Sequence, residues 1–379
     1  MNSIVSENKS QRLLSLDVFR GMAVAAMVLV NNPGDWDHIY PILEHSKWDG
    51  CTPTDLIFPF FLFMVGVSMV YSLETKKSDP SQHATIFWSI LRRAAILYFL
   101  GFTLTIVPRF NFGHFRVMGV LQRISLVYFF SSWIYLKTNQ KTQIGIIAFL
   151  LIGYNLAMSL IPVPGYGPAN LKPETNLGAW IDRLIISPPH LWVQSKTWDP
   201  EGLFSTLPAI ATGLLGAQVG RWLKNKKTES HEKLLILFVA GFLAYLGGMI
   251  WDLWFPINKS LWTSSFVLYT AGLATMTLCC LYYWMDIKGF TRFTKPFLVF
   301  GVNAITVFFL SGLIAKLLGI YHINPSDPKS PSIRLYLYKL IFEPYFSPIN
   351  ASLVAALSLV LLWMGILWIM YNRKIWIKI

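Results

Sequence analysis

Residues 52–73 read TPTDLIFPFFLFMVGVSMVYSL, and no charged side chain follows Asp55 in this run. A helix rises about 1.5 Å per residue and the hydrocarbon core of a bilayer is about 30 Å thick, so roughly 20 such residues make one membrane span. The run opens with Thr52, Pro53 and then Asp55, an order of residues that typically starts a helix. It therefore predicts a transmembrane helix that begins near Thr52.

The same pattern recurs along the chain. Of the 379 residues, 54% are hydrophobic and only 13% are charged, whereas about 25% are charged in a typical soluble domain. Apolar runs bounded by polar, Pro or Gly segments predict ten spans, at 13–31, 53–73, 86–108, 117–136, 143–163, 203–223, 233–252, 261–285, 296–320 and 350–371. We expect an all-α fold, a polytopic integral membrane helical bundle of about ten transmembrane helices.

Basic residues are unevenly divided between the two sides of this bundle. The short segments on the amino-terminal side hold 16 of them: Lys9, Arg12, Lys76, Lys77, Lys137, Lys141, Lys224, Lys226, Lys227, Lys233, Lys288, Arg292, Lys295, Arg373, Lys374 and Lys378. The longer loops opposite, notably 32–52, 164–202 and 321–349, hold 10. The positive-inside rule then makes both termini cytoplasmic. We expect one transmembrane domain over 1–379, with cytoplasmic segments 1–12 and 372–379.

Composition excludes several classes of protein. Cys51, Cys279 and Cys280 offer neither a disulfide framework nor CxxC spacing, so no metal site is indicated. The formal net charge is +13, but the Lys and Arg residues are scattered over loops instead of forming the basic stripe of a nucleic-acid-binding protein. We expect the lipid bilayer, and not nucleic acid, as the partner of this chain.

Four ionisable residues lie in the cytoplasmic halves of predicted spans, where burial in lipid is costly. Asp17 and Arg20 are in the first span, and Arg92 and Arg93 are in the third. Together they could form a basic mouth for a polyanionic cosubstrate. Alternatively, Asp17 and Arg20 neutralise each other at i,i+3, and Arg92 and Arg93 extend to lipid phosphates.

Other polar residues lie in the first outer loop and within later spans. His38 and His45 lie in the first outer loop, and a neutral imidazole there could accept a proton from an amine or a hydroxyl. Asp55 serves either as a helix cap or as the carboxylate that orients an imidazole. Within later spans, Gln122, Arg123 and Asn303 either bind a ligand or join helices by hydrogen bonds.

Six short strings together resemble one family. They are RLLSLDVFRG at 12–21, WDG at 48–50 with Thr52 and DLIFP at 55–59, RVMGVLQRI at 116–124, DPEG at 199–202, PINK at 256–259 with Leu261 and Trp262, and GVNAI at 301–305. In this order they resemble the heparan-α-glucosaminide N-acetyltransferase family of the transmembrane acyltransferases. The strings extend from residue 12 to about 310.

This resemblance implies an enzyme that transfers an acetyl group from cytoplasmic acetyl-CoA to the amine of a terminal glucosamine on the far side. It implies His45 as catalytic base, Asn31 beside the thioester with Asn32 as an alternative, and Asp55 in support. Arg93, in preference to Arg92, would bind acetyl-CoA together with Arg20, Gln122, Arg123 and Asn303. Acceptor binding would fall to Trp48, Glu201, Asn258 and Lys259.

The resemblance leaves other questions open. The chain begins close to the first span, so we expect a bacterial inner-membrane member without the luminal domain of the animal enzyme. An amino-sugar transporter and an O-acetyltransferase acting on a periplasmic glycan are the alternative functions. Cys51 beside His45 also permits a Cys–His nucleophile, and a homodimer is compatible with the sequence.

Overall fold

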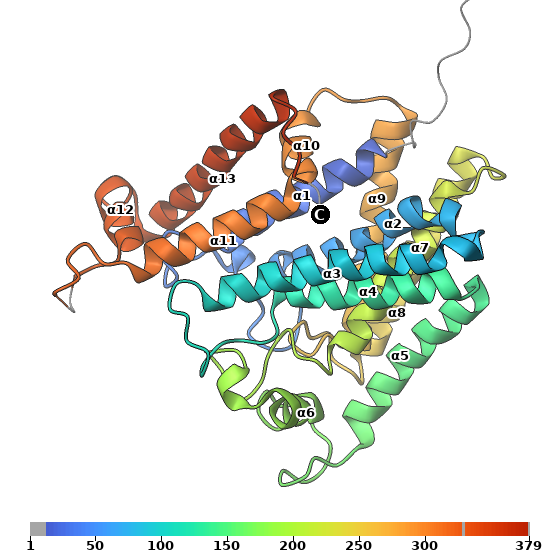
Figure 1. The fold of residues 1–379 in the computed structure, drawn as a ribbon, viewed down its shortest axis with the longest axis horizontal. Coiled ribbons are helices and arrows are strands. Elements are labelled where there is room, and N and C mark those ends of the chain that lie inside the picture. Colours follow the sequence, from blue (N-terminus) through green and yellow to red (C-terminus); the bar gives the residue numbers. More distant parts are fainter. Residues whose placement is uncertain (1–12, 328–329, 378–379) are drawn as a thin grey trace, which may run out of the picture.

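A computed structural model describes residues 13–327 and 330–377. The predicted segment 1–12 lies outside the described residues, as do the last two residues of the predicted tail 372–379. Over the described ranges the fold is all-α, without strands (Figure 1). The helices are α1 (Leu14–Val30), α2 (Ile57–Lys77), α3 (His83–Ile106), α4 (Val120–Lys137), α5 (Gln140–Leu160), α6 (Leu177–Ile186), α7 (Thr206–Lys224), α8 (Ser230–Asp252), α9 (Ser264–Tyr282), α10 (Lys295–Val302), α11 (Ala304–Ile320), α12 (Ile333–Ile341) and α13 (Pro348–Asn372).

Each of the ten predicted ranges contains a helix. Six helices of the described chain are long and apolar enough to cross a membrane: Pro53–Lys77, Pro80–Ile106, Gln140–Leu160, Ser230–Asp252, Ser264–Ile287 and Pro348–Asn372. The range predicted as one span at 296–320 is two helices, α10 and α11, that meet at an angle of 78°. The bend falls at Asn303, whose backbone leaves the helical region.

Several pairs of helices touch along their backbones, among them α2 with α7 and α1 with α10. A Cβ atom on Gly66 of α2 would lie 1.9 Å from the carbonyl oxygen of Gly213 in α7, and one on Gly301 of α10 would lie 2.0 Å from that of Asp17 in α1. Such close approach is typical of membrane helices, where packing of small residues replaces the hydrophobic effect. Figure 1 shows α10, α11 and α13 on one side of α1, with α5 on the opposite side of the molecule.

We predict that Gly66→Ala destabilises the protein by about 1–3 kcal/mol, the usual cost of forcing extra volume into packed helices. The matched control is Gly153→Ala in α5, where an added Cβ meets no atom within 4 Å and where better helix propensity contributes up to about 1 kcal/mol of stability. Thermal unfolding in detergent measures both variants. Equal Tm values for Gly66→Ala and the parent would contradict the packing described for α2 and α7.

Candidate active site

A cavity of about 790 Å³ runs between α1, α2, α3, α4 and the α10–α11 bend. Arg20 and Arg93 line one part of it, and His45, Lys259 and Glu201 line another. Arg20 precedes Asn31, which also lines the cavity, by 11 residues of α1 and its cap, or roughly 16 Å of helix. Polar side chains from both ends of the predicted bundle therefore line the same cavity.

Asp55 joins the start of α2 to His45. Its Oδ2 atom accepts hydrogen bonds from the backbone N–H groups of Thr52 and Ser46, each 3.0 Å long. Its Oδ1 atom lies 2.7 Å from Nδ1 of His45. The two interpretations of Asp55 therefore hold together, because one oxygen caps the helix and the other contacts the imidazole. When Nδ1 of His45 donates to this carboxylate, Nε2 is the nitrogen left to accept a proton.

Lys259 completes this cluster from the loop between α8 and α9. Its Nζ atom lies 3.0 Å and 3.5 Å from the two ring nitrogens of His45 and 3.3 Å from Oδ1 of Asp55. Asn258 fixes the loop, since its amide donates to Asp49 and accepts from the backbone of Leu261. Burial lowers the pKa of Lys259, although the charge of Asp55 opposes this effect.

Arg116 binds two buried carboxylates from the segment before α7. Its guanidinium donates to Asp199, with an Nε–Oδ2 distance of 2.8 Å, and its Nη2 also donates to Glu201. Burial opposes the ionisation of Glu201, but the charges of Arg116, Arg123 and Lys259 together outweigh it, so the pKa of Glu201 lies below its usual value. Arg116 and Glu201 both line the cavity, whose wall therefore includes this ion pair.

At the opposite part of the cavity, Arg20 makes the predicted i,i+3 pair with Asp17, at 3.2 Å. It also donates to Ser68 at 2.6 Å. Arg93 packs over the ring of Tyr128, 4.9 Å from its centroid, and lines the cavity, whereas Arg92 does not. Arg20 therefore pairs with Asp17 and lines the cavity at the same time.

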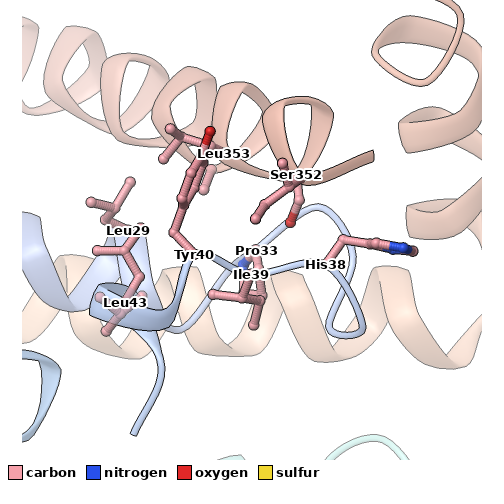
Figure 2. Close-up of a pocket in the computed structure, with 11 residues that line it drawn as sticks. Leu29, Pro33, His38, Ile39, Tyr40, Leu43, Ser352 and Leu353 are labelled. Atoms are coloured by element: carbon pink, nitrogen blue, oxygen red, sulfur yellow. The ribbon is translucent and has the colours of Figure 1, made fainter. Parts of the chain in front are cut away.

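The structure also separates two pairs of alternatives. Asn31 lines the cavity, whereas Asn32 is buried and its amide donates to the carbonyl of Val28. His38 lies 2.6 Å from Asp35 beside a small pocket against α13, where its ring points away from the other labelled side chains (Figure 2). His38 is not among the residues that line the large cavity.

Several predicted ligand-binding residues lie behind the cavity wall. Gln122 packs against Gly101 of α3, and the fully buried Arg123 donates to the carbonyl of Gly202. Asn303 bonds the backbone of Ile375 and Ile377 through its amide, at 3.2 and 3.1 Å. The lining does not include Gln122, Arg123, Asn303, Trp48 or Asn258. These side chains position the wall and do not face the space inside it.

Cys51 does not have the properties of a nucleophile. Burial, together with the charge of Asp55, raises the pKa of its thiol to about 12. A reactive cysteine needs the opposite environment, one that stabilises the thiolate.

Among the lining residues to which the sequence analysis assigned no role are Arg116, Trp192 and Trp198. Arg116 is the first residue of the string RVMGVLQRI, so this motif could have indicated that Arg116 belongs to the site. The two tryptophans lie in a long loop, and nothing in their local sequence separates them from the other aromatic residues of the outer loops.

A family model described as "Heparan-alpha-glucosaminide N-acetyltransferase, catalytic" matches residues 12–255. The chain belongs to this family. The human heparan-alpha-glucosaminide N-acetyltransferase is 29% identical over 352 residues, which cover 78% of this chain and 52% of the human protein. The mouse protein of the same name is 27% identical over 357 residues, with 79% and 53% covered. The chain spans about half the length of the curated relatives it matches.

Within this family member, Asp182 of α6 braces the loop that carries Glu201. Its Oδ1 accepts hydrogen bonds from the backbone of Leu203 and Phe204, at 2.9 and 3.2 Å. A Cβ on Gly202 would lie 1.8 Å from its Oδ2, so no larger residue fits there without movement. Burial raises the pKa of Asp182 to about 7.

This raised pKa predicts how stability depends on pH. An unfolded aspartate has a pKa of about 3.9, so between about pH 4 and pH 7 the folded state retains a proton that the unfolded state has lost. The contribution of Asp182 is therefore fully present at low pH and is lost as the pH rises to about 7.

We expect Asp182→Asn, which keeps the acceptor oxygen, to remove this pH-dependent contribution. The difference in Tm between variant and parent, measured at intervals from pH 4.5 to 8, should change steadily in favour of the variant as the pH rises. Asp37→Asn, at an exposed loop position, controls for loss of a carboxylate. A difference that stays flat over this range would contradict a raised pKa at Asp182.

Proposed function

We propose that this chain transfers an acetyl group from cytoplasmic acetyl-CoA to the amine of a terminal glucosamine, or a similar amino sugar, on the outer side of a membrane. The observation that carries the proposal is the single cavity lined both by Arg20 and Arg93 and by the His45–Asp55 pair. The name that the human and mouse relatives share supports it. A metal ion has no role in the proposed reaction.

The proposed topology has ten spans with both termini cytoplasmic, in the inner membrane of a bacterium. The excess of basic residues in the short loops supports it. In this arrangement Arg20 and Arg93 lie in the cytoplasmic half, and His45 lies at the outer mouth. The acetyl group crosses the membrane while the nucleotide part of its donor stays on the cytoplasmic side.

The cavity has suitable chemistry for acetyl-CoA. The guanidinium groups of Arg20 and Arg93 suit phosphates. Apolar side chains such as Val24, Phe61 and Leu97 line the cavity as well and suit an extended acyl-carrying arm. Its volume of about 790 Å³ falls in the range of roughly 300–1,000 Å³ typical of small-molecule sites.

In the proposed mechanism, Nε2 of His45 removes a proton from the acceptor amine as the nitrogen attacks the thioester carbonyl. Asp55 holds the imidazole through Nδ1, and the side-chain amide of Asn31 donates to the developing oxyanion. The carbon–sulfur bond then breaks, and the thiolate of CoA takes the proton from His45. The new bond is an amide between the acetyl carbon and the sugar nitrogen.

We predict that His45→Ala lowers acetyl transfer by about 10²–10⁴-fold, the usual contribution of a general base. Binding of acetyl-CoA should change little, because the arginines lie in another part of the cavity. His38→Ala is the matched control and should keep the parent rate. Transfer of radiolabelled acetyl groups to methyl α-glucosaminide in proteoliposomes measures the rates.

The same proteoliposomes separate the alternatives. Turnover that survives in His45→Ala would contradict the role of His45. Accumulation of N-acetylglucosamine without acetyl-CoA would indicate a transporter, and equal transfer to an N-blocked acceptor would indicate an O-acetyltransferase.

Arg93 and Arg92 offer a second matched pair. Loss of one charge-assisted contact to a phosphate costs about 1.5–3 kcal/mol, so we expect Arg93→Ala to weaken acetyl-CoA binding by roughly 10- to 100-fold. Arg92→Ala, next to it but outside the cavity lining, should bind as the parent does. Isothermal titration with acetyl-CoA in detergent measures both. Equal losses in the two variants would mean that general surface charge, and not the cavity, attracts the ligand.

A further inference from the structure

Two tryptophans with no role in the mechanism above line the cavity on the segment that carries Glu201. Trp192 and Trp198 are both half-buried, and their rings meet edge to face, with centroids 5.2 Å apart. Trp48 packs against Trp198 with another edge contact, at 5.1 Å. An edge contact engages only part of each ring surface, so aromatic surface remains on the cavity wall.

The segment between the two tryptophans is held in place by the protein itself. The N–H of Lys196 donates to the carbonyl of Trp192 at 2.8 Å, and the hydroxyl of Ser195 donates to the carbonyl of Trp198. Leu191, just before the segment, is buried with Met118 in a small apolar cluster, and Asp199, just after it, is bound by Arg116. A surface ordered before binding loses less entropy when a ligand settles on it.

The carboxylate of Glu201, which is paired with Arg116, gives the same cavity an acceptor for the N–H groups of an amine. Glu201 lies three residues after Trp198 and lines the same cavity, and its carboxylate stays ionised beside Arg116. An indole face attracts ammonium groups and also packs against flat apolar surfaces. A pyranose that carries an amine combines the two features, since one face of its ring is lined by C–H groups.

We propose that Trp192 and Trp198 form the acceptor subsite, on which the ring of an amino sugar stacks with its amino group toward Glu201. This inference rests on the proposed acetyl transfer and names where its acceptor binds. Trp48, whose indole N–H donates to the carbonyl of Leu171 at 3.0 Å, acts as a positioning residue for Trp198. His45 and Lys259 line the same cavity, within which the amine would meet the catalytic base.

The test uses the full chain in nanodiscs, with Trp198→Leu, Trp192→Leu and the conservative Trp198→Phe. For methyl α-glucosaminide we expect each Leu variant to raise KM at least tenfold, and Trp198→Phe to recover most of this loss. The KM for acetyl-CoA should stay within about twofold of the parent. Trp36→Leu, at a 58% exposed tryptophan of the outer loops outside the cavity lining, is the matched control and should change neither KM.

A second measurement does not depend on turnover. Saturation-transfer NMR with methyl α-glucosaminide should give signals from the sugar ring protons in the parent and in Trp36→Leu, and much weaker signals in the double variant Trp192→Leu/Trp198→Leu. Unchanged sugar signals in that variant, or a loss of kcat with no change in KM, would overturn the subsite. An inactive parent that still gives tryptophan-dependent sugar signals would overturn the proposed acetyl transfer and leave the subsite standing.

Discussion

The carboxylate of Asp55 ties together parts of the molecule that would otherwise be independent. Through one oxygen it begins the second predicted span, and through the other it contacts His45 at 2.7 Å. It is also almost completely buried, with 1% of its side chain exposed, so its charge needs all of these partners. Asp55 therefore contacts three segments at once: the loop that carries His45, the start of α2, and the α8–α9 loop that carries Lys259.

The cavity wall is organised in two layers. The inner layer faces the space and contains Arg20, Arg93, Arg116, Asn31, His45, Trp192 and Trp198. The outer layer holds the inner one in position: Asn258 fixes the loop of Lys259, Arg123 fixes Gly202, and Asp182 fixes the backbone after Glu201. Rigid support of this kind matters in group transfer, because small displacements of the reacting groups cost much of the rate.

Much of the fold could be predicted from the sequence, because spans in lipid must be apolar and helical and each run is a local signal. The motif resemblance also singled out His45, its spacing singled out Arg93, and both residues line the cavity. The bend at Asn303 could not be predicted from the sequence, because the hydrogen-bonding partners of Asn303, which are Ile375 and Ile377, lie more than 70 residues away along the chain. The same holds for Trp192 and Trp198, whose place depends on the pairing of Asp199 with Arg116, 83 residues distant. A polar residue within an apolar run indicates that its side chain has a hydrogen-bonding partner in the fold. It does not indicate whether that partner is a ligand or the protein backbone.

The bend between α10 and α11 also gives the cavity an electrical property. Gly301 and Val302, the last residues of α10, and Ala304 and Ile305, the first residues of α11, all lie on the cavity wall, so the negative end of one helix dipole and the positive end of the other meet there. Each end carries about half a charge, spread over the unpaired C=O groups of α10 and the unpaired N–H groups of α11. These charges belong to the backbone, so no protonation event removes them and no side-chain rotation carries them away. An unbroken span at the same place would have had its dipole ends at the two membrane surfaces instead.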